Sequence, residues 1–182
     1  MEQLTNEETE RRPQYYFWQK LGQLKFDLVL YSLYFSQCVS RLRIIRIGSA
    51  VLTAATTGAW MEWHHIEWVD NTCLIAIVVL QTISAGIELL PYEKRKRKLR
   101  KLIDALEPLY NKMEWEWFRI VLGELTNVEI LKKTYYYQSK RTITTRKYFG
   151  NDVIPNCKRV ANKAKEESDS YLVNLGGRWE NE

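Results

Sequence analysis

The stretch "NTCLIAIVVLQTISAGIELLPYEKRKRKLRKL", residues 71–102, passes from an uncharged apolar run to a dense run of lysine and arginine. Seven of the eight residues at positions 94–101 are basic. A basic run directly after an apolar helix is typical of the cytoplasmic end of a membrane span, where it contacts anionic lipid. A nucleic-acid-binding run would be expected to carry interleaved aromatic residues or a recognised fold, and this one has neither. The stretch therefore predicts a membrane segment.

A second uncharged run, "IGSAVLTAATTGAWM" at residues 47–61, lies upstream of the first. Basic residues precede it, and the connection "EWHHIEWVDN" contains acidic residues but no lysine or arginine. Under the positive-inside rule the connection crosses the membrane and both termini stay in the cytoplasm. The tryptophans at this connection fit an interfacial aromatic belt. We therefore predict a transmembrane hairpin with helices at 44–61 and 71–90 and a loop at 62–70; the alternative is that both runs are core helices of a soluble α-domain.

The remainder of the chain predicts further helices. Pro13 suits the first turn of a lead helix over 13–43, after a disordered terminus at 1–12. Apolar residues along this helix recur at steps of three and four and predict packing against the C-terminal helices of the same chain; the alternative is that the stripe lies on the inner leaflet of the membrane. They are Leu21, Leu24, Leu28, Tyr31, Phe35, Cys38 and Leu42.

Residues 91–175 predict a cytosolic helical region, followed by a frayed tail at 176–182. Pro108 indicates a break or kink in the first of its helices. Thr126 and Glu129 have the spacing of a capping box and mark a helix start. The run "RTITTRKYFGNDVIPN", residues 141–156, favours a short strand or an irregular segment. The predicted fold class is an all-α membrane protein.

Motifs for catalysis are missing from the sequence. It contains no glycine-rich phosphate loop, no nucleophile elbow and no HExxH motif. The three cysteines are widely spaced and predict neither a disulfide framework nor a zinc site. His64 and His65 are adjacent and do not share the one-turn spacing of metal ligands on a helix. We expect no enzyme, no cofactor and no metal. The net charge of +5 fits an anionic partner, either nucleic acid or a phospholipid surface. The position of the basic run after an apolar segment favours membrane lipid and no nucleic acid polymer.

The predicted spans contain polar stripes that could line a pore. Such a pore needs several hairpins, so the protein would be a homo-oligomer. The candidate pore-lining residues are Gln81, Ser84, Glu88, Leu74, Ile77, Ser49, Thr53, Thr56 and Thr57. Small residues for helix packing are Ala50, Ala54 and Gly58. Candidate contacts to lipid headgroups are Arg43, Arg46, Lys94, Arg95, Lys96, Arg97, Lys98, Arg100 and Lys101.

The chain resembles the SLATT group of bacterial proteins in the order of three features. These are "SRLRIIRIGSAVLTA", a close pair of apolar segments, and then "EKRKRKLRKLIDALEPLY". The resemblance covers most of residues 13–140 and is architectural. It implies a pore-forming effector of anti-phage defence at the bacterial inner membrane, which depolarises the cell during abortive infection. The implied trigger is a partner sensor protein or a cyclic nucleotide or oligonucleotide. The alternatives are a non-conducting membrane anchor or scaffold for a cytosolic partner, and a phage holin-like lysis protein.

Overall fold

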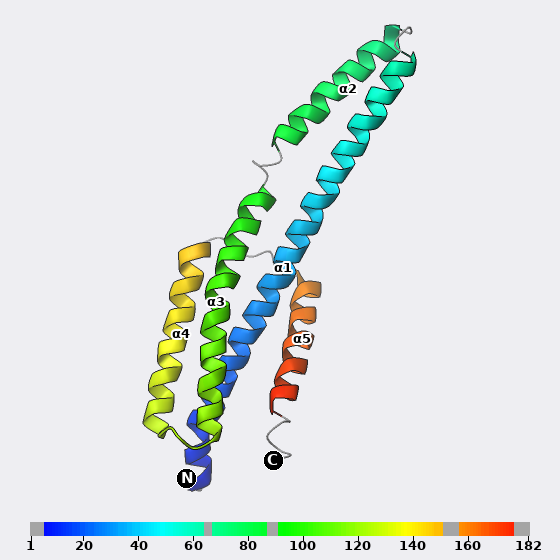
Figure 1. Cartoon of the computed structure of the whole chain (residues 1–182). Coiled ribbons are helices and arrows are strands. Elements are labelled where there is room, and N and C mark those ends of the chain that lie inside the picture. Colours follow the sequence, from blue (N-terminus) through cyan, green and yellow to red (C-terminus); the bar gives the residue numbers. More distant parts are fainter. Residues whose placement is uncertain (1–5, 64–66, 87–90, 151–156, 177–182) are drawn as a thin grey trace. The chain divides into compact units, whose positions relative to one another are not determined.

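The computed structural model describes residues 6–63, 67–86, 91–150 and 157–176, and over these residues the chain is helical (Figure 1). The helices are α1 (Asn6–Trp63), α2 (Glu67–Gly86), α3 (Pro91–Val121), α4 (Asn127–Phe149) and α5 (Lys158–Gly176). They form two compact units. The body unit consists of residues 1–34 and 98–182, and the hairpin unit consists of residues 35–97.

The N-terminal half of α1 is the central element of the body unit. Its Phe17 ring stacks on Trp117 of α3 at a centroid distance of 6.3 Å and meets Tyr137 of α4 edge-on at 6.4 Å. On the side of α5, a Cβ added to Gly22 would lie 3.1 Å from Leu172 Cδ1, so the two helices approach closely there. The predicted apolar stripe supplies much of this core, since Leu21, Leu24 and Tyr31 are buried. The prediction that the stripe packs on a C-terminal helix is confirmed at Tyr31, whose ring stacks on Phe149 of α4.

The membrane part of the predicted fold class is wrong. Over the residues that the structure describes, no helix is both long enough and apolar enough to cross a membrane. The segment 44–61 belongs to α1, where alanine, threonine and glycine make the sequence only weakly apolar. In α2 the uninterrupted apolar run extends only from Cys73 to Leu80, about 12 Å of helix at 1.5 Å per residue. A hydrocarbon core is about 30 Å thick.

The helix boundaries differ from the sequence predictions at three places. α1 begins at Asn6, before Pro13. α3 continues through Pro108. The predicted strand or irregular segment is helical up to Phe149, and its residues 151–156 lie outside the described part. Tertiary contacts outweigh the β-propensity of this segment, because Phe149 stacks on Tyr31 of α1.

The predicted capping box is confirmed at the start of α4. The Thr126 hydroxyl accepts a hydrogen bond from the backbone N–H of Glu129, and the Glu129 carboxylate accepts one from the backbone N–H of Thr126. These reciprocal bonds satisfy two backbone donors that the helix end would otherwise leave open. They also lower the pKa of Glu129, the backbone bond to Thr126 contributing most.

A buried ion pair joins α1 to α4. The Arg141 guanidinium donates to Asp27 Oδ2 through Nε at 2.7 Å and lies within 2.6 Å of it through Nη2. The exposed fraction of the Asp27 side chain is 12%. Burial raises the pKa of Asp27 above its usual value, and Arg141 offsets part of this effect. Burial and the Asp27 charge raise the pKa of the adjacent Tyr31 to about 12.

We expect Arg141→Met to lower the free energy of unfolding by about 2–3 kcal/mol at pH 7, because it leaves the Asp27 carboxylate buried without its partner. Removing Arg141 raises the pKa of Asp27 further, so the folded variant takes up a proton more readily in acid. The deficit should therefore be largest at neutral pH and shrink as the pH falls.

Urea unfolding at pH 7 and pH 4 measures this difference. Arg146→Met, which removes an exposed arginine of the same helix, is the control and should change stability little. The double variant Asp27→Asn/Arg141→Met should recover part of the loss at pH 7. An equal loss for Arg141→Met at both pH values would assign the effect to packing and not to charge.

Candidate functional site

The hydroxyl stripe predicted to line a pore bonds to its own helix. Ser49 donates to the carbonyl of Arg46 at 2.9 Å, and Thr53 donates to that of Ser49 at 2.8 Å. The next two threonines do the same: Thr56 donates to the Leu52 carbonyl at 2.7 Å and Thr57 to the Thr53 carbonyl at 2.8 Å. Each hydroxyl proton is therefore used within α1, which is a common arrangement for threonine inside a helix.

The other predicted pore-lining residues lie on α2 or beyond its end. Leu74 and Gln81 are exposed and Ile77 is partly exposed. The side chain of Ser84 and the whole of Glu88 lie outside the described part of the chain. The structure thus places Leu74, Ile77 and Gln81 on one short helix, and the pore lining stays a prediction.

The small residues predicted for helix packing face open space within this chain. Ala50, Ala54 and Gly58 are exposed. A Cβ added to Gly58 would meet no heavy atom within 4 Å beyond its own helix backbone and neighbours. Packing inside the described hairpin unit therefore does not require a small residue at this position.

Large apolar side chains are exposed on both helices of the hairpin unit. On α1, Ile44, Ile47 and Val51 follow one another at steps of three and four, so they share one face. On α2, the two pairs Leu74 with Val78 and Ile75 with Val79 form a second such face. We call these the α1 face and the α2 face. Exposed apolar side chains that share a helix face are candidates for an interaction surface.

In the basic tract, residues 94–101, Leu99 is buried and Lys96 is partly covered, and the other residues are exposed. Lys96 donates to both carboxylate oxygens of the buried Glu93, at 2.7 and 2.8 Å. This hydrogen bond, more than any other contact, lowers the pKa of Glu93. Arg43 and Arg46 of α1 and the other basic residues of the tract are exposed. The contact of these residues with lipid headgroups stays a prediction.

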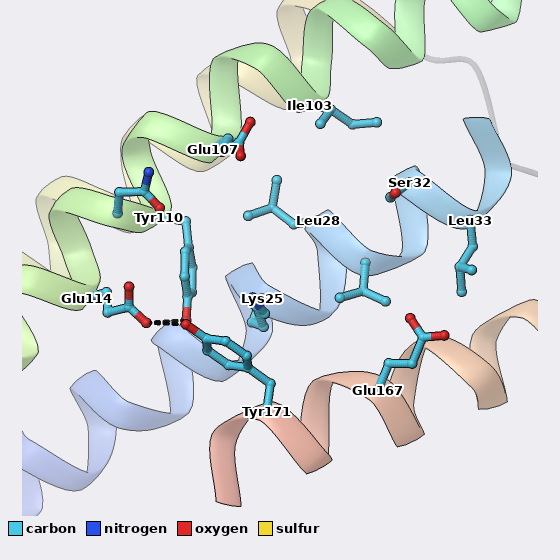
Figure 2. Close-up of a pocket in the computed structure, with 12 residues that line it drawn as sticks. Lys25, Leu28, Ser32, Leu33, Ile103, Glu107, Tyr110, Glu114, Glu167 and Tyr171 are labelled. Carbon is cyan, nitrogen blue, oxygen red and sulfur yellow. Dashed lines mark hydrogen bonds between the residues drawn. The ribbon is translucent and has the colours of Figure 1, made fainter. Parts of the chain in front are cut away.

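A pocket of about 330 Å³ lies in the body unit between α1, α3 and α5 (Figure 2). Glu114 on α3 accepts hydrogen bonds at one carboxylate oxygen from two tyrosines: Tyr110 of α3 at 3.1 Å and Tyr171 of α5 at 2.6 Å. The Lys25 ammonium lies 3.4 Å from the Tyr171 ring centroid and 4.9 Å from that of Tyr110. The two rings thus hold a cation within the range of cation–π attraction.

The protonation of this cluster follows from its burial. Burial raises the pKa of Tyr110, and the neighbouring Glu114 charge adds to the effect. The pKa of Tyr171 is raised for the same two reasons. Both phenols therefore remain donors to Glu114 at neutral pH. Burial lowers the pKa of Lys25, while Glu114 and Glu107 offset part of that shift.

Sequence reasoning did not find this pocket. Lys25, Glu114 and Tyr171 lie far apart along the chain, and no local motif connects them. No family model, curated protein or solved structure matches the chain. What these observations define is an all-helical chain with a charged aromatic pocket in one unit and exposed apolar helix faces in the other.

We expect Tyr171→Phe to lower the free energy of unfolding by about 1 kcal/mol, because it removes the hydrogen bond to Glu114 but keeps the ring beside Lys25. Tyr171→Leu, which also removes the ring, should cost more. Urea unfolding monitored by circular dichroism provides the measurement. Tyr136→Phe is the control, since Tyr136 is exposed on α4. A Tyr171→Phe variant as stable as the parent would show that the bond makes no net contribution.

Proposed function

We propose that the protein is a non-enzymatic assembly protein that associates with further copies of the same chain through its α1/α2 hairpin. The observation that carries the proposal is the pair of exposed apolar faces on this hairpin. Val51 is 62% exposed on the α1 face and Val78 is 60% exposed on the α2 face. Covering such side chains contributes roughly 25 cal/mol per Å² of apolar surface removed from water.

The choice of a second copy as the partner rests on the complementary shapes of the two helices. α1 carries the small residues Ala50, Ala54 and Gly58, with open space beyond Gly58. α2 carries bulky residues such as Leu74 and Val78. Bulky residues of one helix fit beside small residues of another, since small residues let helices approach closely. Every copy of the chain offers both halves of this contact.

Charge also favours association between copies. The α1 segment from residue 47 to 61 contains no lysine, arginine, aspartate or glutamate, and neither does the α2 segment from 71 to 82. Two such surfaces can be brought together without desolvating a formal charge, which would oppose association. The hydroxyls of Ser49, Thr53 and Thr57 already donate within their helix, so their burial leaves no donor unpaired.

The resemblance to the SLATT group adds a cellular role to this proposal. It implies an effector of bacterial anti-phage defence in which a signal sets off assembly of many copies. We propose this role for the present chain, with assembly through the hairpin as the step that the signal controls. Membrane-crossing helices form no part of this proposal, and localisation at the inner membrane stays a prediction.

Replacing a valine by aspartate on either hairpin face should weaken assembly. We expect the parent to form concentration-dependent oligomers, and Val51→Asp and Val78→Asp to weaken the association at least tenfold each. An unpaired carboxylate in an apolar contact costs more than the roughly 1.4 kcal/mol that corresponds to a factor of ten. Sedimentation velocity and light scattering on purified protein provide the measurement.

Two valines of the body unit are matched controls. Val128 on α4 is 61% exposed and Val173 on α5 is 71% exposed, so Val128→Asp and Val173→Asp introduce the same charge at similar exposure. Both should assemble like the parent, and all variants should keep its helical circular dichroism. A parent that stays monomeric up to about 100 μM would contradict the proposal, because specific homo-oligomers are tighter than this. So would a monomer whose hairpin binds lipid vesicles instead of its own copies.

A further inference from the structure

The pocket of the body unit has a surplus of negative charge. Three carboxylates line it, from Glu107 and Glu114 on α3 and Glu167 on α5. The cation that lines it is Lys25 of α1. Glu114 accepts hydrogen bonds from two tyrosine hydroxyls. Glu167 lies 3.6 Å from the ammonium of Lys163 one turn earlier on α5, but both side chains are exposed and such a pair contributes little, so the Glu167 carboxylate can exchange Lys163 for a ligand. The pocket therefore attracts cations and repels anions.

The position of Lys25 shows which kind of cation fits. Its ammonium group lies against the Tyr171 ring and near the Tyr110 ring, and Glu114 fixes both rings through their hydroxyls. Aromatic rings grouped around an ammonium are a common device for recognising organic cations. The protein thus holds one alkylammonium group of its own in the pocket, between two rings and beside a carboxylate.

The rest of the pocket suits an alkyl chain with a second positive end. Its apolar wall is formed by Leu28, Val29, Leu33 and Ile103. Glu107 comes from α3 and Glu167 from α5, and Figure 2 shows them on either side of the α1 residue Leu28. Asn111 and Ser32 add neutral hydrogen-bonding groups to the lining. A chain of methylenes can lie on the wall while ammonium groups at its ends reach carboxylates.

We propose that this pocket binds a small linear polyamine, an alkyl diamine or triamine, whose ammonium groups pair with Glu107 and Glu167. The volume of about 330 Å³ lies at the lower end of the range for small-molecule pockets and fits a ligand of this size. The same charges disfavour a nucleotide here, because phosphates would face three carboxylates. This inference does not rest on self-association, since all lining residues belong to the body unit.

Isothermal titration calorimetry of the full chain with 1,4-diaminobutane and spermidine tests the proposal. We expect saturable binding of one ligand per chain, with 1-aminobutane at equal ionic strength bound at least tenfold more weakly. Glu107→Gln and Glu167→Gln should each weaken binding at least tenfold, because each removes one pairing charge. Glu166→Gln is the matched control, since Glu166 is the exposed neighbour of Glu167 on α5 and does not line the pocket.

Lys25→Met gives a prediction of opposite sign. It removes the ammonium that competes for the tyrosine rings and the carboxylates, so it should strengthen diamine binding severalfold. Circular dichroism confirms that each variant is folded. The proposal is overturned if neither amine binds saturably, if Glu166→Gln weakens binding as much as Glu167→Gln, or if cyclic AMP binds at this pocket in place of the amines.

Discussion

The burial of Phe17 between α3 and α4 is the contact on which the body unit depends. The Phe17 side chain is fully buried, and its ring meets Trp117 on one side and Tyr137 on the other. Since α1 also approaches α5 closely at Gly22, one helix connects three others that do not follow it directly in the chain. Truncating such a buried ring costs about 3–5 kcal/mol, so loss of this aromatic contact would weaken the packing of α1 on α3 and α4.

The same arrangement creates the pocket. Lys25 lies two turns beyond Phe17 on α1, and the packing of α1 places its ammonium beside tyrosines from α3 and α5. The hydrogen bond that Tyr171 donates to Glu114 helps to orient its ring beside the cation. A polar cluster of this kind is satisfied as a whole, and removing one member leaves the others partly unpaired.

The parts of the fold that were predictable depend on local patterns. The spacing of Leu21, Leu24 and Tyr31 predicted a buried helix face. Thr126 with Glu129 predicted a helix start. Each of these signals is made of residues that lie close together in the sequence. The short strand or irregular segment predicted from residue 141 is wrong up to Phe149, where the chain is helical, because Arg141 and Phe149 contact Asp27 and Tyr31 of the distant α1. The pocket was not predictable for the same reason: its members meet only after tertiary folding.

The membrane prediction and the assembly proposal both rest on the apolar residues of α1 and α2, but a membrane span and a helix interface require different numbers of such residues. A span needs about 20 apolar residues in succession. An interface between helices needs only one apolar face of each, which α1 and α2 have.

The described hairpin unit itself buries few apolar side chains, among them Cys38, Leu42 and Cys73. Because helices in water gain most of their stability from tertiary packing, α2 has more to gain from a further surface than a helix of the body unit has. A second copy that covers Leu74 and Val78 would supply that packing, so assembly and the stability of the hairpin are expected to be coupled.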